Sequence, residues 1–329
     1  IREILLDKQA VCSYGAKTEL SMEGGRIIST EPFYAYIKIA EGCSNNCTYC
    51  AIPSIRGKYR SRRMEDIVKE ARWLAENGVT ELVVVAQDTT RYGEDIYGKS
   101  MLPELLTALC EIDGFKWIRT LYCYPERITD ELLDVIAKED KLVKYLDMPI
   151  QHCNRNILKR MNRHGDRETL TALIKKIREK IPNVTLRTTL ITGFPGETEE
   201  QFEELCEFVK EIRFERLGCF AYSPEEGTPA EKFEDQVPLK DRERRAEIIM
   251  EEQMIISDSF NEAALDSEVE VVCEGFDRYA ECYYGRSQAD APEIDGKIFF
   301  LSEDKVRVGE YVKVKIDDTM DYDLIGSKM

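Results

Sequence analysis

The stretch EGCSNNCTYCAIPSIRGKYRSRR, residues 41–63, places three cysteines within eight residues. Cys43, Cys47 and Cys50 form a C-x3-C-x2-C triplet with no fourth cysteine nearby. Thiolates at this spacing can fold back onto one metal centre. The preceding segment Phe33–Ala40, FYAYIKIA, is rich in aromatic and branched residues and predicts a buried strand. We therefore expect a strand that runs directly into a cysteine loop.

Three kinds of centre compete for the triplet. A structural zinc site normally has four Cys or His ligands in paired groups, and both histidines, His152 and His164, lie about a hundred residues away. A ferredoxin-type cluster needs a fourth cysteine, and the nearest downstream one, Cys110, falls in a predicted helix. Three thiolates on a four-iron cluster leave one iron open for a ligand. This spacing favours a catalytic cluster over zinc, over electron transfer alone and over a chance grouping of core cysteines.

Six predicted strands alternate with predicted helices, which implies parallel pairing through right-handed crossovers. The fold class is therefore α/β, a partial or closed six-unit TIM-like (β/α) barrel with its function at the carboxyl ends of the strands. After the first strand, the expected strands are Glu81–Ala86, Trp117–Tyr122, Lys144–Met148, Val184–Ile191 and Arg216–Tyr222, and the expected helices are Met64–Asn77, Met101–Cys110, Thr129–Lys138, Asp166–Lys180 and Glu199–Ile212.

The character of the chain changes after Tyr222. A long charged helix is expected from Leu239 to about Ala264, followed by five short strands in about sixty residues, which predicts a small antiparallel barrel. The predicted organisation is a leading connector or edge hairpin at 1–32, the barrel at 33–238, a linker helix at 239–264 and the small barrel at 265–329.

Composition and charge set further limits. The chain has 329 residues, 43% of them hydrophobic, and no apolar run approaching the ~20 residues of a membrane helix. The eleven cysteines are odd in number and irregularly spaced, which favours reduced thiols in a cytoplasmic protein. A net charge of -17 disfavours broad binding to phosphates and suits a basic protein partner. Because residue 1 is Ile, we expect that a preceding segment is missing.

The motif C-x3-C-x-aromatic-C after the first strand of such a barrel resembles the radical S-adenosylmethionine (SAM) enzymes. The resemblance implies a [4Fe-4S] cluster bound by Cys43, Cys47 and Cys50, with SAM chelating the open iron. Its reductive cleavage in that family gives a 5'-deoxyadenosyl radical that abstracts hydrogen from an unactivated carbon. Tyr49 would shield the cluster and pack near the adenine, or it is an ordinary core aromatic.

Further cofactor contacts are implied by position. Gln87 and Asp88 follow the second strand and would contact SAM or substrate, although Asp88 suits a helix cap equally well. Arg187 would grip the SAM carboxylate or form an internal salt bridge. Gly193 opens the turn GFPGET, which resembles the family's cofactor-lining motif, and Tyr222 would border the adenine or seal the barrel end.

His152 and the cysteines outside the triplet are expected to have structural roles. His152 has the right chemistry for acid-base work, but a lone histidine after a strand is more often a structural hydrogen-bonder. The cysteines outside the triplet, including Cys206, Cys219 and Cys273, are most simply core residues. No residue is therefore assigned as a certain catalytic acid or base.

Three features narrow the resemblance to the methylthiotransferases: GKYRSR at 57–62, QHCNRNILKRMNR at 151–163 and the small barrel, which resembles a TRAM domain. Members insert sulfur into a C–H bond and methylate it. Their N-terminal domain holds a second [4Fe-4S] cluster on three cysteines, whereas this chain has only Cys12 before Cys43. We therefore expect that this domain is missing here and that the chain alone does not complete the reaction.

Two substrates compete within that family, a tRNA adenosine and an aspartate of a small-subunit ribosomal protein. Residues 267–329 hold fifteen acids and eight bases, which suits a basic ribosomal protein better than RNA. The phrase RTLYCYPERI at 119–128 also resembles the ribosomal-protein branch. A basic cluster favours RNA or a missing domain: Arg56, Lys58, Arg60, Arg62 and Arg63. A reductant protein would supply electrons, and a non-catalytic iron-sulfur redox or scaffold protein is the alternative from another class.

Overall fold

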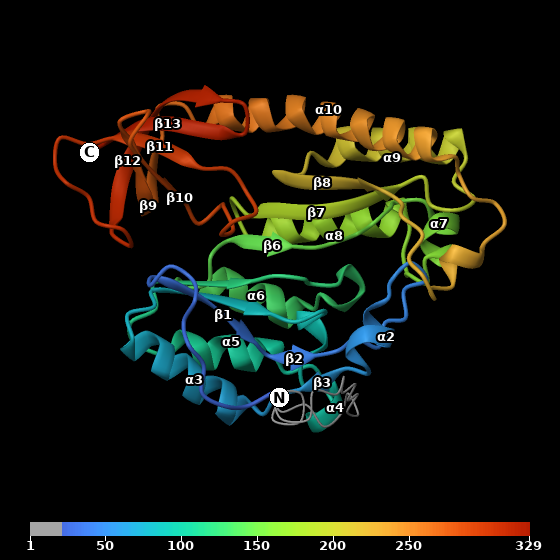
Figure 1. The fold of residues 1–329 in the computed structure, drawn as a ribbon, viewed down its shortest axis with the longest axis horizontal. Coiled ribbons are helices and arrows are strands. Elements are labelled where there is room, and N and C mark those ends of the chain that lie inside the picture. Colours follow the sequence, from blue (N-terminus) through green and yellow to red (C-terminus); the bar gives the residue numbers. More distant parts are fainter. Residues whose placement is uncertain (1–21) are drawn as a thin grey trace, which may run out of the picture.

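The computed structural model describes residues 22–329 (Figure 1). Residues 1–21, most of the predicted connector, lie outside the described residues. Residues 22–33 contain no helix or strand, so the described part of the connector is irregular and forms no edge hairpin.

Six parallel strands form the main barrel, and all six were predicted. The strands β1 (Tyr34–Lys38), β4 (Glu81–Val85) and β5 (Trp117–Thr120) make one parallel sheet. The strands β6 (Tyr145–Asp147), β7 (Thr185–Thr192) and β8 (Arg216–Ala221) make a second. Among the described residues, a single parallel bridge joins Ile118 of β5 to Leu142, which lies just before β6. The barrel is therefore partial, with a seam between β5 and β6.

The crossover helices confirm the predicted alternation. They are α3 (Met64–Glu76), α5 (Leu102–Cys110), α6 (Asp130–Lys138), α8 (Arg167–Lys180) and α9 (Glu199–Ile212). Helices α8 and α9 begin with capping boxes at Asp166 and Thr198, which satisfy backbone N–H groups of the first turn. Shorter elements complete this region: β2 (Ala40–Glu41), α2 (Ile52–Arg56), β3 (Arg60–Ser61), α4 (Glu94–Tyr97) and α7 (Arg155–Arg160).

Each barrel strand has two faces of different chemistry. In β1, Ala35 and Ile37 pack into the large apolar core together with residues of the surrounding helices. Tyr34 and Tyr36 alternate with them and therefore point to the opposite, inner side of the barrel. The helices thus bury one face of the sheets, and the inner face is left for aromatic and polar side chains.

The chain leaves the main barrel through helix α10 (Leu239–Ala263), which packs along β8 and leads to a second, closed barrel (Figure 1). This terminal barrel contains β9 (Glu268–Asp277), β10 (Cys282–Arg286), β11 (Ile298–Leu301), β12 (Tyr311–Met320) and β13 (Asp323–Lys328). Their order around the barrel is β10-β11-β13-β12-β9.

The expectation of a wholly antiparallel terminal barrel was wrong, because β11 and β13 pair in parallel. The reason is geometric. Directions cannot alternate all the way around a closed ring with an odd number of strands, so one neighbouring pair must run the same way. The other four pairings of the barrel are antiparallel.

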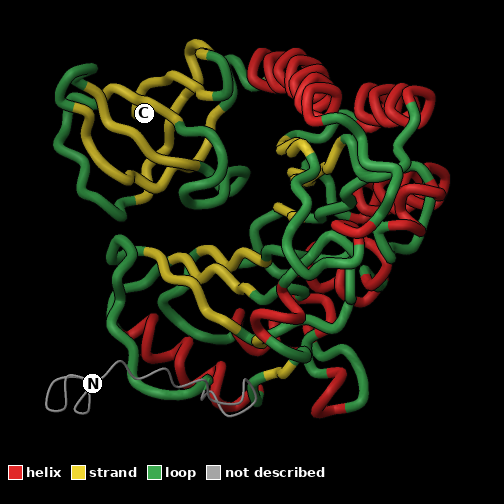
Figure 2. The backbone as a smooth tube through the Cα atoms, turned by 45° about the vertical axis from the view of Figure 1, so that its right-hand side comes forward, coloured by secondary structure: helices red, strands yellow, loops and turns green. Residues whose placement is uncertain are grey.

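The terminal barrel closes the amino ends of the main-barrel strands. Residues 287–297, between β10 and β11, form a segment that we name the floor loop. In Figure 2 the terminal barrel lies beside the strands of the main barrel. Polar contacts join the two barrels: Arg286 with Glu81, Gln288 O with Arg119 Nη1 at 3.0 Å, Asp290 with Arg216 at 2.7 Å, Glu293 with the Tyr34 hydroxyl at 3.2 Å, and Asp295 with the Tyr145 hydroxyl at 2.7 Å.

Candidate active site

The cysteine loop lies between β2 and α2, on the opposite side of the main barrel from the floor loop (Figure 1). Cys43 and Cys47 are buried, and Cys50 is partly buried. Gly42 makes the loop possible, because it has φ +76° and an added Cβ would lie 2.3 Å from the carbonyl oxygen of Lys58. The Cys43 N–H donates to Gly57 O at 3.1 Å and fixes the loop against the chain that follows α2.

The donors around the thiols suit a cluster of several irons. Burial raises the pKa of the Cys43 and Cys50 thiols, while the backbone N–H groups of Asn45 and Ile52 oppose that rise by donating to the sulfurs. Such N–H groups stabilise thiolates that ligate iron. Within residues 22–329 no three His, Cys, Asp or Glu side chains converge at the spacing of a single metal ion. Three thiols with backbone N–H donors beside them suit iron ligation.

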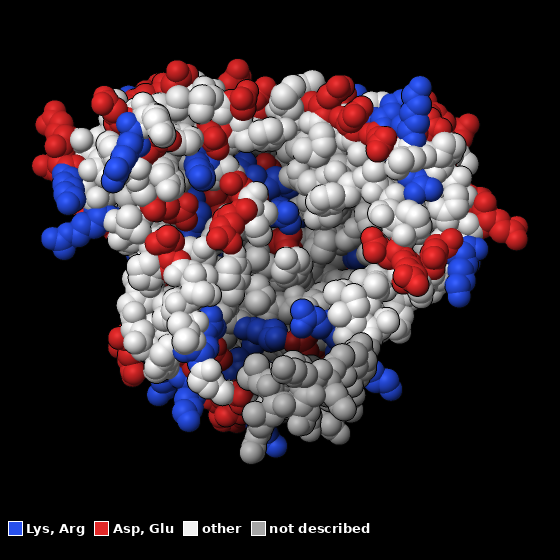
Figure 3. All heavy atoms as spheres, viewed as in Figure 1, with Lys and Arg blue, Asp and Glu red and all other residues white. Residues whose placement is uncertain are grey.

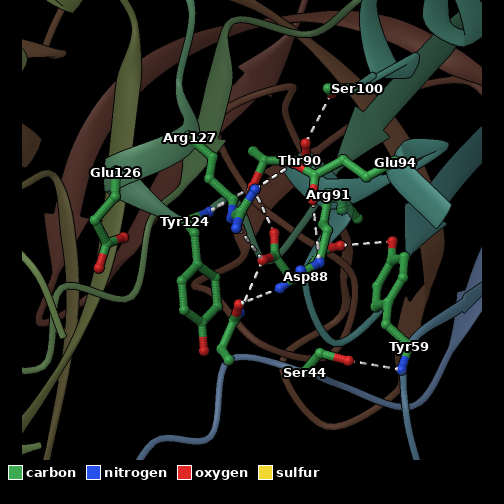
Figure 4. A network of polar contacts seen from close by, with 12 residues as sticks. Ser44, Tyr59, Asp88, Thr90, Arg91, Glu94, Ser100, Tyr124, Glu126 and Arg127 are labelled. Carbon is green, nitrogen blue, oxygen red and sulfur yellow. Dashed lines mark hydrogen bonds and ion pairs between the residues drawn. The ribbon is translucent and has the colours of Figure 1, made fainter. Parts of the chain in front are cut away.

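Asp88 ties the cysteine loop to the end of β4 (Figure 4). Its side chain is fully buried, and its carboxylate accepts from Asn45 Nδ2 at 2.8 Å and from the Thr90 hydroxyl at 2.5 Å. Its carbonyl oxygen accepts from the Tyr59 hydroxyl at 2.8 Å. Burial raises the pKa of this carboxyl. Asp88 occupies the N-cap position of a short 3-10 helix but makes no side-chain capping bond there.

Gln87 lies beside Asp88 and is partly buried. Its Oε1 atom has no hydrogen-bond partner among the described residues. A buried amide oxygen without a partner costs free energy, so Gln87 offers an acceptor to a ligand or water at this end of the barrel.

Tyr49 and Tyr222 come together in one apolar cluster, which also contains Phe194. The Phe194 and Tyr222 rings are 5.3 Å apart in an edge-to-face arrangement. The Tyr222 hydroxyl has no hydrogen-bond partner in the described chain, and burial raises its pKa. The Tyr49 hydroxyl accepts from Arg163 Nη1 at 3.5 Å. Two predicted cofactor contacts thus share one wall of the site, although they are 173 positions apart in the sequence.

Arg187 lies away from this wall. It is the third residue of β7, and its Nη1 atom donates to Asp147 at 2.9 Å while its Nε atom is 3.6 Å from Asp295 of the floor loop. The internal salt bridge that the sequence left open is therefore present. Contact with SAM stays a prediction for this residue.

Gly193 packs against helix α10. Its φ is +66°, and an added Cβ would lie 2.3 Å from Cγ of Arg242. Its N–H donates to Glu197 at 2.7 Å. The close approach of Arg242 explains why glycine stands here, and a cofactor-lining role for this turn stays a prediction.

His152 is fully buried and has structural partners. Its Nδ1 accepts from the Asn154 N–H at 2.9 Å, and its Nε2 is 3.8 Å from Glu197. Burial, with a smaller contribution from Arg245, lowers the pKa of His152 to about 3. Burial also raises the pKa of Glu197 to about 7, against the opposing effect of Arg245. A histidine that stays neutral and enclosed is a structural hydrogen-bonder.

Two important side chains were not singled out from the sequence, Tyr124 and Arg163. The Tyr124 hydroxyl is 3.5 Å from the Cys47 sulfur, and the Arg163 guanidinium lies 4.2 Å from the centre of the Tyr124 ring. Arg163 is nearly buried and also pairs with Glu126 at 3.0 Å. The segments that contain them were recognised in the sequence, but spacing alone did not indicate that Tyr124 and Arg163, 39 positions apart, would stack beside the cysteines.

A pocket of about 410 Å³ opens next to the cysteine loop. Several of its residues are drawn in Figure 4, where they converge from separate loops. The complete lining is Ser44, Asn45, Arg91, Tyr124, Glu126, Arg127, Asn162, Arg163 and His164. These residues follow β2, β4, β5 and β6, so the pocket lies at the carboxyl ends of the strands, where α/β barrels place their function.

The basic cluster is only partly a free surface. Arg62 is 4% exposed and pairs with Glu23 at 2.6 Å and Glu70 at 2.7 Å. Arg56 lies 3.8 Å from Glu41, whereas Lys58 and Arg63 are exposed. At least part of this cluster therefore stabilises the fold. No helix of the described chain has the length and apolar character needed to cross a membrane.

Sequence comparisons place this geometry in a known class. The profile of the Radical SAM superfamily matches residues 37–209, and that of the TRAM domain matches residues 267–328. The chain is a radical SAM protein with a terminal TRAM barrel, and the cofactors of this class are SAM and a [4Fe-4S] cluster.

Close relatives define the family more narrowly. The chain is 51% identical over 320 residues to ribosomal protein uS12 methylthiotransferase RimO of Clostridium tetani, covering 97% of this chain and 71% of the relative. It is 50% identical to RimO of Caldanaerobacter subterraneus, covering 99% of this chain and 74% of the relative. The chain belongs to the RimO family of methylthiotransferases, which has a second cluster. Among solved structures, coproporphyrinogen III oxidase of Escherichia coli matches 69% of this chain and 52% of its own, at 21% identity and a TM-score of 0.49.

Proposed function

We propose that this chain methylthiolates the β-carbon of an aspartate in the small-subunit ribosomal protein uS12. The observation that carries the proposal is the cysteine loop: three thiols at the carboxyl ends of a parallel barrel, joined through Asn45 to the buried Asp88. The relatives at 50–51% identity carry the name of this activity.

Residues at different positions around the cysteine loop are proposed to have different roles. Cys43, Cys47 and Cys50 would hold the cluster, which together with SAM supplies one-electron chemistry when bound. Gln87 offers an unpaired oxygen to SAM, and Tyr49 and Tyr222 form the apolar wall expected beside an adenine. Asp88 holds the cysteine loop in place. The buried Arg163 packs on the Tyr124 ring, whose hydroxyl lies beside the Cys47 sulfur.

The surface charge supports a basic protein substrate over RNA. Figure 3 shows Asp and Glu side chains over the terminal barrel and α10 on this face of the molecule, with Lys and Arg between them. The excess of acids in residues 267–329 favours association with a positively charged ribosomal protein. Transfer to a tRNA adenosine is the second candidate, supported by the exposed Lys58 and Arg63.

Three further partners and conditions follow from the same chemistry. A reductant protein must deliver the electron, and the family's second cluster would take part in sulfur insertion. All ten cysteines of the described chain are free thiols, which supports a reducing, cytoplasmic setting.

Two measurements test the proposal. The first is anaerobic reconstitution with iron and sulfide, followed by dithionite and SAM; formation of 5'-deoxyadenosine is expected, and its absence would exclude a radical enzyme. The second compares binding of uS12 and of tRNA to the same reconstituted chain. Binding of uS12 that weakens with added salt is expected, whereas binding of tRNA alone would transfer the assignment to the tRNA branch.

A further inference from the structure

Tyr122 is held in a conformation that its side chain does not favour. It follows β5 with φ +60°, a region that a bulky residue rarely occupies. Its neighbours Leu121 and Cys123 are buried, yet Tyr122 itself is 42% exposed. Such a backbone persists only where surrounding contacts fix it, and it is typical of sites where a side chain must be aimed.

Both peptide groups of Tyr122 are fixed by neighbouring strands. Its N–H donates to Asp147 Oδ2 at 2.9 Å, at the end of β6. Its carbonyl oxygen accepts from the Thr89 N–H at 3.0 Å and from the Thr89 hydroxyl at 3.1 Å. Thr89 follows Asp88, which is bonded to Asn45 of the cysteine loop. Tyr122 is thus anchored between the seam of the barrel and the site.

The Asp147 carboxylate is in turn positioned from the terminal barrel. Its Oδ1 atom accepts from Arg187 Nη1 at 2.9 Å, and Arg187 Nε lies 3.6 Å from Asp295 of the floor loop. Asp295 is itself fixed by the Tyr145 hydroxyl at 2.7 Å and by the Ala291 N–H at 2.8 Å. The Asp147 and Asp295 side chains are no more than 4% exposed, and the Arg187 side chain between them is 19% exposed.

Tyr122 lies within electrostatic reach of Tyr36, a residue of the inner face of β1. Burial is the main cause of the raised pKa of Tyr36, and the Tyr122 hydroxyl is among the smaller contributors. The Tyr36 hydroxyl donates to Pro292 O of the floor loop at 3.4 Å. Tyr36 therefore connects the inner face of β1 to the floor, while the backbone of the partly exposed Tyr122 follows the carboxyl end of β5.

We propose that Tyr122 contacts the protein substrate at the barrel mouth and that Asp147, Arg187 and Asp295 are positioning residues that aim it. This inference rests on the proposed function for the identity of the substrate. It makes the terminal barrel a part of the substrate site, because Asp295 belongs to the floor loop. An exposed, rigidly held tyrosine is a side chain on which protein recognition commonly depends.

Hydrogen exchange tests the positioning without any turnover. In Asp295→Asn, amide exchange in the peptide covering Leu121–Tyr124 is expected to rise at least about fivefold, the lower end of usual coupling effects. The matched control is Asp290→Asn, which changes an equally buried carboxylate of the same loop whose partner is Arg216. Equal increases in the two variants, or none in Asp295→Asn, would overturn the positioning role.

Binding of uS12 to the reconstituted chain tests the contact itself. Tyr122→Ala is expected to weaken binding about tenfold, as for a buried interface tyrosine. Tyr279→Ala, at a fully exposed tyrosine of the terminal barrel, should leave it unchanged. Asp295→Asn should weaken binding in the wild type but not further in Tyr122→Ala, and additive losses would refute the connection. If the wild type does not bind uS12, the proposed function and the contact fail together, while the exchange result still decides the positioning.

Discussion

The two ends of the main barrel differ in how their buried polar side chains are paired. At the floor, Glu81 forms ion pairs with Arg119 and Arg286, and all three side chains are at most 2% exposed. At the mouth, Gln87 and Tyr222 keep polar atoms without partners in the described chain. Arg119 Nη2 and Arg216 Nε of the floor also have no hydrogen-bond partner among the described residues. The difference therefore lies in charge: at the floor opposite charges pair and stabilise the fold, whereas at the mouth neutral oxygens are left to accept from a ligand.

The largest expected effect is at the mouth. Cys47→Ala should lower 5'-deoxyadenosine formation by roughly 100-fold or more, because the bound cofactor carries the chemistry. Its thermal midpoint without cofactor should change little. Iron content, product yield and a melt of the same preparation measure this, with Cys206→Ala in α9 as the control. Loss of iron binding in both variants would mean that the mouth does not hold a specific cluster.

The next effect is at the floor. Glu81→Ala leaves Arg119 and Arg286 without their shared carboxylate, and breaking a buried pair in this way costs about 3–5 kcal/mol of unfolding free energy. Urea denaturation measures the loss. Glu104→Ala removes the surface pair with Lys99 and should leave the unfolding free energy nearly unchanged. Comparable losses in the two variants would erase the contrast between floor and surface.

A third test concerns the His152–Glu197 pair, which is enclosed near the mouth. The pKa of His152 is lowered to about 3 in the folded protein. Its contribution therefore decreases the free energy of unfolding as pH falls below 6.5, because the unfolded chain binds the proton first. The pKa of Glu197 is raised to about 7 in the folded protein. Its contribution therefore decreases the free energy of unfolding as pH rises from 4.5 through 7, because the unfolded chain releases the proton first. Between pH 4.5 and 6.5 the two slopes oppose each other.

Replacing one partner should reveal the slope of the other. Relative to the wild type, Glu197→Gln should lose on the order of 2–3 kcal/mol between pH 6.5 and 4.5, at 1.36 kcal/mol per pH unit. His152→Gln should show the reverse trend. Urea denaturation at the two pH values measures both. Parallel pH profiles in all three proteins would show that neither group is perturbed.

The smallest expected effect is electronic. Tyr124→Phe removes the hydroxyl 3.5 Å from the Cys47 sulfur, which should make the cluster harder to reduce. The potential should fall by no more than about 60 mV, the one-electron equivalent of a hydrogen bond of about 1.4 kcal/mol. A redox titration followed by EPR measures the shift, with Tyr279→Phe as the control. An unchanged potential would place the hydroxyl outside the cluster's environment, and a rise would contradict the predicted hydrogen bond to the sulfur.

The sequence predicted what depends on local pattern. The six strands were recognisable because their apolar runs face the helices, and α8 and α9 because Asp166 and Thr198 cap them. The floor was not predictable, since Glu81 and Arg286 meet only after the whole barrel has formed. Arg187 illustrates the limit: its place on a strand was evident, but its carboxylate partners belong to β6 and to the terminal barrel.

The seam between β5 and β6 has a consequence for synthesis on the ribosome. Of the two sheets of the main barrel, the one next to the cysteine loop is translated before the other, and chains fold in order from the amino terminus. Arg119 of this sheet has no Gln288 to bond until the chain is 169 residues longer. The floor loop contacts both sheets, through Arg119 on one side and Arg216 on the other. The terminal barrel, which is translated after both sheets, is therefore the part that holds them together.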